Sequence, residues 1–336
     1  MHAVNQRNKR LGKTMKAKLL LLSASVLAAN VAMAEVKFYG KANVSLQGIE
    51  VEENDVKTQD NFELISNASR LGVKGSSDIN HGLEALFQVE YEVQLDDGDK
   101  GGKTLTQRNS FVGVKGDFGT VMAGIHDTPT KMIAKPVDIF SDLKFADIKN
   151  AVEGENRQKN MVMYRSPDLA GFKIDAMFAP GEEKTDVNDQ NGIADAISAS
   201  VSYKIAGFSL AASYDGDVDD QDAVRLVGAY SIGAFATSLM LQQAEIVDSA
   251  SNEKEEGIVA TASYKIDDWK IKALVGTATE SEDTVEDLDR NQLVLGADYK
   301  LAKNAKVFAF VTDYEDKDSG VNSSNEYYGI GTELKF

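Results

Sequence analysis

The sequence predicts an all-β fold, a 16-stranded antiparallel transmembrane β-barrel, on three observations: a repeated aromatic corner, period-two alternation, and connections that alternate between long and short. In the corner, a Tyr ends one segment, a turn of a few residues follows, and a bulky apolar residue usually opens the next segment. The copies begin at Tyr164, Tyr203, Tyr230, Tyr264 and Tyr299. Aromatic residues repeated at one level are typical of the interfacial girdle of a membrane barrel.

Alternation of apolar with small or polar residues places the strands. After Ile197, apolar residues lie on one face of the segment, and Ser198, Ser200, Ser202 and Lys204 lie on the other. We expect sixteen strands, at residues 36–47, 62–75, 83–95, 108–116, 120–126, 160–166, 172–179, 196–205, 208–215, 223–232, 235–245, 257–266, 269–279, 292–301, 305–314 and 325–336.

The expected connections alternate in length along the chain. Residues 48–61 form a long acidic stretch, 76–82 are tight, 96–107 are long and 116–119 are tight. Outer-membrane barrels combine short periplasmic turns with longer outward loops in this way. A soluble sandwich also alternates but turns its apolar face inward, and periodicity alone does not decide which face is out. Sixteen strands with no break into domains favour the barrel, whose lumen is too wide for side chains to fill.

Residues 1–34 are predicted to be a signal peptide, which leaves the barrel at residues 35–336. They carry six basic residues and no acidic one, then an apolar run from Leu19 to Leu27 and the small-residue end Ala32-Met33-Ala34. This order of regions is that of a secretory signal. The apolar run is too short to span a membrane comfortably, which argues against a transmembrane anchor. Met15 is an alternative start.

Composition excludes several classes of function. The formal net charge is −17, and setting aside the six basic residues of 1–34 leaves the rest at −23. Such acidity argues against nucleic acid as a partner. Cysteine is absent, so the chain has neither disulfides nor thiolate metal sites. No apolar run after residue 34 approaches the roughly 18 residues of a spanning helix.

Several stretches together resemble the general, non-specific porins of Gram-negative bacteria, over essentially the whole chain after residue 34. Each stretch is weak alone, but their order and spacing are specific. They are Val36-Lys37-Phe38-Tyr39-Gly40-Lys41, Ser69 to Gly75 with Gly82 to Gln88, Arg108 to Val114, Met161 to Pro167, and the terminal Phe336. The resemblance implies a trimer with its third outward loop, expected at residues 127–159, folded into the lumen as a constriction. Phe336 matches the family's outer-membrane assembly signal.

The resemblance also implies a pore in which basic residues of the wall face acids of the third loop. Arg70, Arg108 and Arg157 match the basic ladder, and by strand parity Lys37, Lys41 and Lys74 extend it. The expected loop acids are Asp138, Asp142 and Asp147. The family's Pro-Glu-Phe-Gly-Gly loop tip is absent, and residues 136–140 are the nearest stretch. The alternative for each arginine is a lumen residue paired to the nearest carboxylate.

The expected function is that of an outer-membrane channel through which ions and small hydrophilic solutes diffuse passively, filtered by size and charge. Charges at the constriction matter most, because screening is effective beyond roughly 8 Å in physiological salt. No cofactor or metal is expected within the barrel. Acids of the outer loops form a solvated face that favours cations mildly and could bind divalent cations shared with lipopolysaccharide phosphates; they are Glu52, Glu53, Asp219, Asp220, Glu255 and Glu256. The expected partners are a homotrimer, outer-membrane lipid, lipopolysaccharide and small hydrophilic solutes.

Three alternatives stay open. An outer-membrane hydrolase needs a nucleophile beside a base, and His81 and His126, the histidines beyond the signal, have no neighbouring motif of recognisable spacing. A sugar-specific porin needs a file of inward aromatic residues, of which parity supplies few, Tyr39 and Tyr327 among them. A soluble exported lectin or adhesin would need no membrane.

Overall fold

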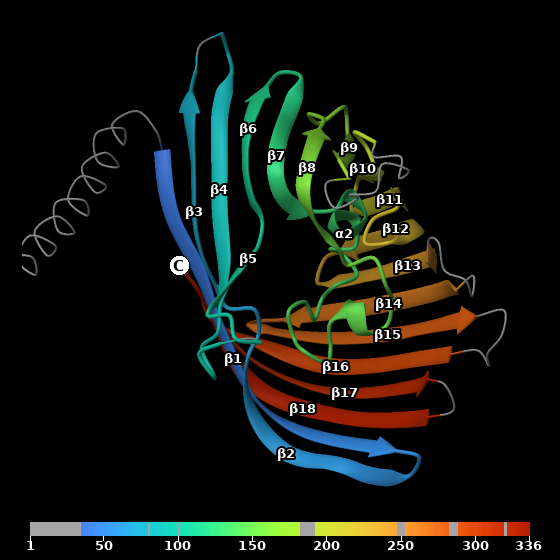
Figure 1. Cartoon of the computed structure of the whole chain (residues 1–336). Helices are drawn as coiled ribbons and strands as arrows, with labels where there is room; N and C mark the ends of the chain where they lie inside the picture. Colours follow the sequence, from blue (N-terminus) through green and yellow to red (C-terminus); the bar gives the residue numbers. More distant parts are fainter. Residues whose placement is uncertain are drawn as a thin grey trace, which may run out of the picture.

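The computed structural model describes residues 35–79, 81–99, 101–181, 192–246, 253–281, 288–318 and 321–336, so the predicted signal peptide 1–34 lies outside the described residues. The described chain is almost entirely β (Figure 1). The strands are β1 Glu35–Glu53, β2 Val56–Ser66, β3 Arg70–Asp78, β4 Glu84–Val93, β5 Leu105–Gln107, β6 Ser110–Gly116, β7 Gly119–Asp127, β8 Arg157–Arg165, β9 Phe172–Ala179, β10 Ala196–Ile205, β11 Phe208–Gly216, β12 Gln221–Ile232, β13 Phe235–Ile246, β14 Lys254–Ile266, β15 Trp269–Ser281, β16 Leu288–Ala302, β17 Ala305–Asp318 and β18 Val321–Lys335.

These strands form one closed antiparallel barrel with sixteen strand positions around the ring, which we call staves. β2 and β3 both pair with β1, and β5 and β6 both pair with β4, so two of the sixteen staves are interrupted strands. β1 pairs with β18 and closes the ring. At the junction Gly40 and Phe336 exchange two backbone hydrogen bonds, 2.9 and 3.1 Å long. The predicted 16-stranded barrel is therefore confirmed.

The two faces of the wall are inverted relative to those of a water-soluble protein. In β10, Ile197 is 41% exposed whereas its neighbour Ser198 is 1% exposed. At the short-turn end, aromatic residues pair on the outside: Phe208 stacks on Tyr230 with ring centroids 4.2 Å apart, and Trp269 lies 4.8 Å from Tyr299. Apolar side chains on the outside and polar ones on the inside suit a lipid exterior. This arrangement excludes the soluble sandwich, lectin and adhesin alternatives.

The first outward connection is shorter than expected. The acidic stretch 48–61 is mostly strand, because β1 continues to Glu53 and β2 begins at Val56. Only Asn54 and Asp55 form the turn, with φ of 49° and 64°. Two consecutive left-handed residues are the requirement of a tight hairpin turn, and Asn and Asp adopt that conformation more readily than most residues. The acidic residues of this stretch therefore extend the wall beyond the lipid.

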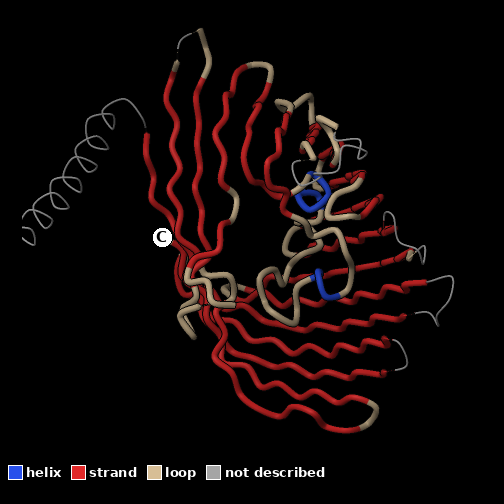
Figure 2. Tube along the Cα trace, in the orientation of Figure 1, coloured by secondary structure: helices blue, strands red, loops and turns tan. Residues whose placement is uncertain are grey.

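The third outward connection, residues 128–156, is the segment that fills part of the ring. It contains helix α2 Pro129–Ile133 and the short 3-10 helix Ile148–Asn150. Figures 1 and 2 show this segment on the concave side of the sheet, beside β11 to β16. Among the described residues, no helix combines the length and apolarity needed to cross a membrane.

Candidate functional site

The segment 128–156 is held against the inner wall by apolar packing. Its side chains Val137, Phe140, Ile148 and Val152 are buried in one cluster with inward residues of the wall, namely Val227, Met240, Val259, Leu274, Val294, Phe308 and Phe310. Wall glycines make room for it: a Cβ on Gly296 would come 2.6 Å from the ring of Phe140. The wall therefore has a hollow that matches the segment.

A fully buried arginine joins both ends of the segment to the wall. Arg225 of β12 is 0% exposed. It donates from Nη1 to the carboxylate of Glu155 at 2.6 Å and to the carbonyl of Thr130 at 3.2 Å, and from Nη2 to the carbonyl of Glu153 at 2.7 Å. Its Nε donates to Oε1 of Gln242 at 2.7 Å. The planar guanidinium of Arg225 thus donates hydrogen bonds to both the start and the end of the same segment.

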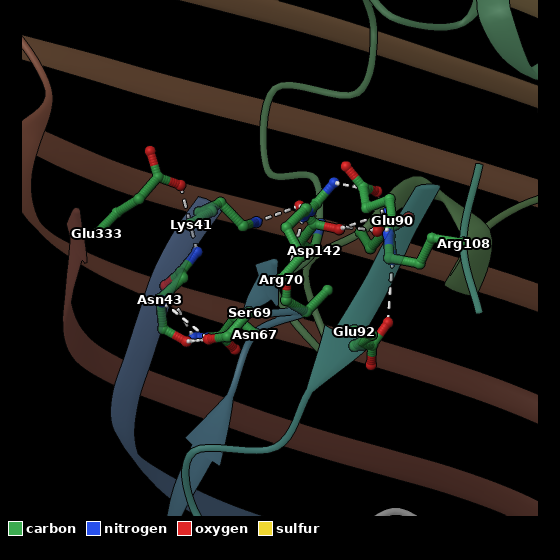
Figure 3. Close-up of polar contacts among 12 residues, drawn as sticks. Lys41, Asn43, Asn67, Ser69, Arg70, Glu90, Glu92, Arg108, Asp142 and Glu333 are labelled. Atoms are coloured by element: carbon green, nitrogen blue, oxygen red, sulfur yellow. Dashed lines mark hydrogen bonds and ion pairs between the residues drawn. The ribbon is translucent and has the colours of Figure 1, made fainter. Parts of the chain in front are cut away.

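Far along the segment, Asp142 meets three cations of the opposite wall (Figure 3). Its carboxylate accepts a hydrogen bond from Lys41 Nζ of β1 at 2.5 Å and another from Arg70 of β3. Arg108, between β5 and β6, lies 4.0 Å away. The Asp142 backbone is left-handed, with φ 69°, which aspartate tolerates better than most residues. Three basic side chains from separate staves thus converge on one loop carboxylate.

Two glutamates of β4 complete this arrangement. Arg108 donates from Nε to Glu90 at 2.9 Å and from Nη1 to Glu92 at 3.0 Å. Arg70 also lies 3.9 Å from Glu90. We call Lys41, Arg70, Arg108, Asp142, Glu90 and Glu92 the constriction cluster. Glu90 and Glu92 were not among the residues predicted from the sequence, although parity in the strand expected at 83–95, with Val89 on the lipid side, places both on the lumen face.

The pKa of Asp142 reflects its electrostatic interaction with the basic side chains of the wall. Burial alone would raise this pKa, but the charges of Arg70 and Lys41 outweigh burial and hold the pKa below its usual range. A depressed carboxyl pKa contributes stability that is present above the ordinary value of about 3.9 and is lost as pH falls through the depressed value. The contact between Asp142 and the wall should therefore persist at neutral and mildly acidic pH.

The other three expected wall cations form their direct contacts outside this cluster. Arg157 pairs with Asp127 at 2.8 Å and donates to Asn109 at 2.7 Å. Lys37 pairs with Glu35 near the short-turn end. Lys74 lies over the ring of Tyr39, 5.0 Å from its centroid. The structure thus brings together four of the nine expected residues: Lys41, Arg70, Arg108 and Asp142.

The remaining two loop acids contribute to the segment's own structure. Asp147 caps the short helix by accepting from the backbone nitrogen of Lys149 at 3.0 Å, and it accepts from that of Asp142 at 3.0 Å. Asp138 is enclosed, and burial together with Asp147 and Glu155 raises its pKa well above the usual range. A carboxyl that resists ionisation contributes little to the field in the lumen.

One outer acid expected on a solvated face is instead inside. Glu255 of β14 is 4% exposed and accepts from Arg290 Nη2 at 2.7 Å. The same Arg290 nitrogen donates to Glu280 at 2.8 Å. The reason is parity: Glu256 faces outward, so its neighbour Glu255 turns to the lumen, where it also receives the backbone nitrogen of Glu153 at 3.1 Å.

The aromatic and histidine residues considered for a sugar-specific porin or a hydrolase make contacts that do not suit those functions. Tyr327 does face inward, but Phe145 of the segment 128–156 stacks on it with centroids 3.6 Å apart and an interplanar angle of 2°. Tyr39 donates its hydroxyl to Glu90 at 3.0 Å. The Nδ1 atom of His126 lies 2.8 Å from the carbonyl oxygen of Asp127. A covered Tyr327 does not favour a file of aromatic residues for sugar rings.

A closed transmembrane barrel with a polar lumen and a charged cluster facing an enclosed loop is a diffusion channel of the outer membrane. The sequence model of Gram-negative porins matches residues 21–319. The chain belongs to this porin family.

Known proteins agree in sequence and in fold. The major outer membrane protein P.IB of Neisseria gonorrhoeae is 28% identical over 330 residues, which cover 86% of this chain and 90% of that protein. The anion-selective porin from Comamonas acidovorans has a TM-score of 0.74 at 23% identity, covering 90% of this chain and 100% of that one. The in-vitro folded trimer form of OmpT from Vibrio cholerae has a TM-score of 0.68 at 19% identity, covering 90% and 100%. The protein is therefore an outer-membrane porin that conducts passively.

Proposed function

We propose that the constriction cluster is the charge filter of this porin and that it makes the channel only weakly selective. The observation that carries the proposal is the balance within the cluster. Three cations, Lys41, Arg70 and Arg108, face three carboxylates in direct ion pairs or within 4.0 Å. Paired charges cancel beyond about one screening length, roughly 8 Å in physiological salt. Acids at the outer mouth then leave a mild preference for cations.

A planar-bilayer recording tests this filter. Under a salt gradient, the reversal potential should lie closer to zero than to the equilibrium potential of either ion, on the cation side. A reversal potential near that of chloride would contradict the proposed balance. Neutral solutes should pass by size alone, and an oligosaccharide that blocks current saturably would instead indicate a sugar-specific channel. Catalysis is no part of the proposal, since diffusion through a wetted lumen needs none.

We propose a homotrimer as the working assembly. Support comes from OmpT of Vibrio cholerae, of which a trimer form is a structural neighbour. Insertion events in the bilayer should then show three equal conductance steps, and single steps throughout would count against a trimer.

We further propose that outward carboxylates above the lipid belt hold divalent cations shared with lipopolysaccharide phosphates. Glu52 and Glu256 are exposed at the outer ends of β1 and β14, and both lie on strands of the barrel wall. Hard divalent cations prefer such oxygen ligands. Chelation by EDTA should lower the midpoint of heat denaturation in lipopolysaccharide-containing membranes, with no such change in phosphocholine vesicles. An equal midpoint with and without EDTA would remove the proposal.

A further inference from the structure

Lysines gather on the inner wall at the short-turn end of the barrel, away from the constriction cluster. We call Lys265, Lys270, Lys272, Lys300 and Lys306, on β14 to β17, the inner lysine cluster. Lys265, Lys270 and Lys300 face the lumen, because the aromatic residue next to each of them faces lipid. Tyr264 and Trp269 are exposed on the lipid side, and Tyr299 pairs with Trp269 there. Short turns mark the periplasmic end of such barrels. The cluster therefore lines the periplasmic mouth of the pore.

The register of the sheet places like charges directly opposite one another. Lys265 lies opposite Lys270 across β14 and β15, and Lys300 lies opposite Lys306 across β16 and β17. Residues directly opposite in an antiparallel pair have Cβ atoms about 4.5–5.5 Å apart, and like charges there are destabilising. On their other sides Lys270 lies opposite Asp298 and Lys306 lies opposite Glu333. Five lysines thus share two carboxylates, and the region keeps a net positive charge.

Two carboxylates of the described inner wall lie beside this cluster, Asp298 opposite Lys270 and Glu333 opposite Lys306, and both are already in ion pairs. Asp298 pairs with Lys272 at 2.9 Å and with Lys306 at 3.0 Å. The next acid along the wall, Glu333, pairs with Lys335 at 3.1 Å. Within the described chain, no carboxylate oxygen lies within 4.0 Å of the side-chain nitrogens of Lys265, Lys270 or Lys300. These three ammonium groups are therefore ready to bind an anion from solution.

The outer mouth has the opposite sign. Glu153, Glu255 and Glu280 share Arg290 there. An anion thus meets an acidic entrance from outside, a balanced constriction, and then a basic chamber on the periplasmic side. Since screening confines each charge to its own part of the lumen, roughly 8 Å in physiological salt, the basic chamber acts separately from the acidic entrance.

We propose that the inner lysine cluster is a binding station for small oxyanions, such as phosphate or a dicarboxylate, on the periplasmic side of the constriction. Lysine binds phosphate as a point charge with three donors on a flexible stem, which suits a solute that must also leave. Binding that is favourable enough to enter and weak enough to release is what conduction requires. This goes beyond the weakly selective filter, because it assigns a second site with its own ligand class.

The test is block of the single-channel current by inorganic phosphate in about 0.1 M potassium chloride, where the screening length is about 10 Å. The variant replaces Lys265, Lys270 and Lys300 with Gln. The matched control replaces Lys115, Lys173 and Lys204, which are spread over other staves of the same mouth, so that the same charge is removed. Because the chain has no cysteine, Asn54→Cys in the first outward turn, labelled from one chamber, reports the orientation of each inserted channel.

Phosphate added on the periplasmic side should block the unsubstituted channel, and the variant should need about threefold more for half-block, given charges about 8 Å from the ligand in water. The control should shift less than the variant. In 1 M salt, where screening acts over about 3 Å, the difference should vanish while channel conductance shows that both proteins have folded. Equal half-blocking concentrations in variant and unsubstituted protein, or an equal shift in the control, would overturn the station.

Should the triple variant fail to insert, Lys300→Gln alone should give a smaller shift in the same direction, and no shift would overturn the proposal equally. A variant that still forms channels keeps the porin function, so loss of phosphate block would test the anion-binding station separately from the porin function.

Discussion

Replacing Arg225 with methionine is expected to release the segment 128–156 from the wall and to give channels of larger conductance and greater open-channel noise. Methionine keeps the packing volume but removes four hydrogen bonds, which reach Thr130, Glu153, Glu155 and Gln242. Removing one partner of a buried ion pair typically costs about 3–5 kcal/mol, because the other charge stays buried. The barrel itself should survive, since its sheet is closed independently of the segment.

Two measurements check this expectation. Trypsin should cleave folded Arg225→Met within the segment, at Lys131, Lys144 or Lys149, faster than it cleaves the unsubstituted protein. Arg165→Gln is the control, because Arg165 also lies on the inner wall and pairs with Asp175 at 2.8 Å, away from the segment. Unchanged conductance and cleavage in Arg225→Met would show that apolar packing alone holds the segment.

A second variant isolates the buried charge as the cause. Burial raises the pKa of Glu155, and the charge of Arg225 opposes that rise. Without Arg225, Glu155 should take up a proton more readily, so the excess noise of Arg225→Met should decrease on acidification. Adding Glu155→Gln removes the charge at every pH. The double variant should therefore be quieter than Arg225→Met at neutral pH, and equal noise in both would exclude the unpaired carboxylate.

Replacing Asp142 with asparagine is expected to turn the channel toward anions. The substitution keeps the size of the side chain but leaves Lys41 and Arg70 without their loop partner. Two unit charges 4 Å apart interact in water by about 1 kcal/mol, so the anion-to-cation permeability ratio should rise about fivefold. The reversal potential under a salt gradient measures the change directly, and high salt should diminish it through screening.

The natural control for this variant is Asp138→Asn in the same segment. Because its pKa is raised by burial and by Asp147 and Glu155, Asp138 contributes less charge near neutral pH and its substitution should change selectivity less. Acidification gives a second readout: the unsubstituted channel should approach the selectivity of Asp142→Asn only below the ordinary aspartate pKa of about 3.9. A shift at mildly acidic pH, or equal effects of the two variants, would show that Asp142 is not the dominant loop charge.

Much of the wall could be predicted from sequence because strand alternation is local. The side of each residue follows from its neighbours, so Lys41 could be assigned to the lumen by parity, and Arg70 and Arg108 by their match to the basic ladder of porins. The third connection could be recognised by its length and its lack of alternation. The prediction of a long first connection was wrong, because acidic strand residues beyond the lipid resemble a loop when only composition is considered.

The charge partners could not be predicted in the same way. Lys41 and Asp142 are 101 positions apart, and Arg225 and Thr130 are 95 apart, so their contacts depend on the path of the segment inside the closed ring. Nothing local distinguishes Asp142 from Asp147, yet one faces the basic wall and the other caps a short helix. Arg225 lies on a strand with ordinary alternation, and no motif indicates that it joins both ends of the segment.

The sequence by itself thus determined which residues share a face of each strand, because alternation depends on residues one or two positions apart, and the number of strands with the aromatic corners favoured lipid as the solvent of the apolar face. Only the tertiary structure decided which acidic side chains form ion pairs with which basic ones. Closure of the barrel brings distant staves within hydrogen-bond reach, and the hollow beside Gly296 determines where the segment, and with it Asp142, comes to lie.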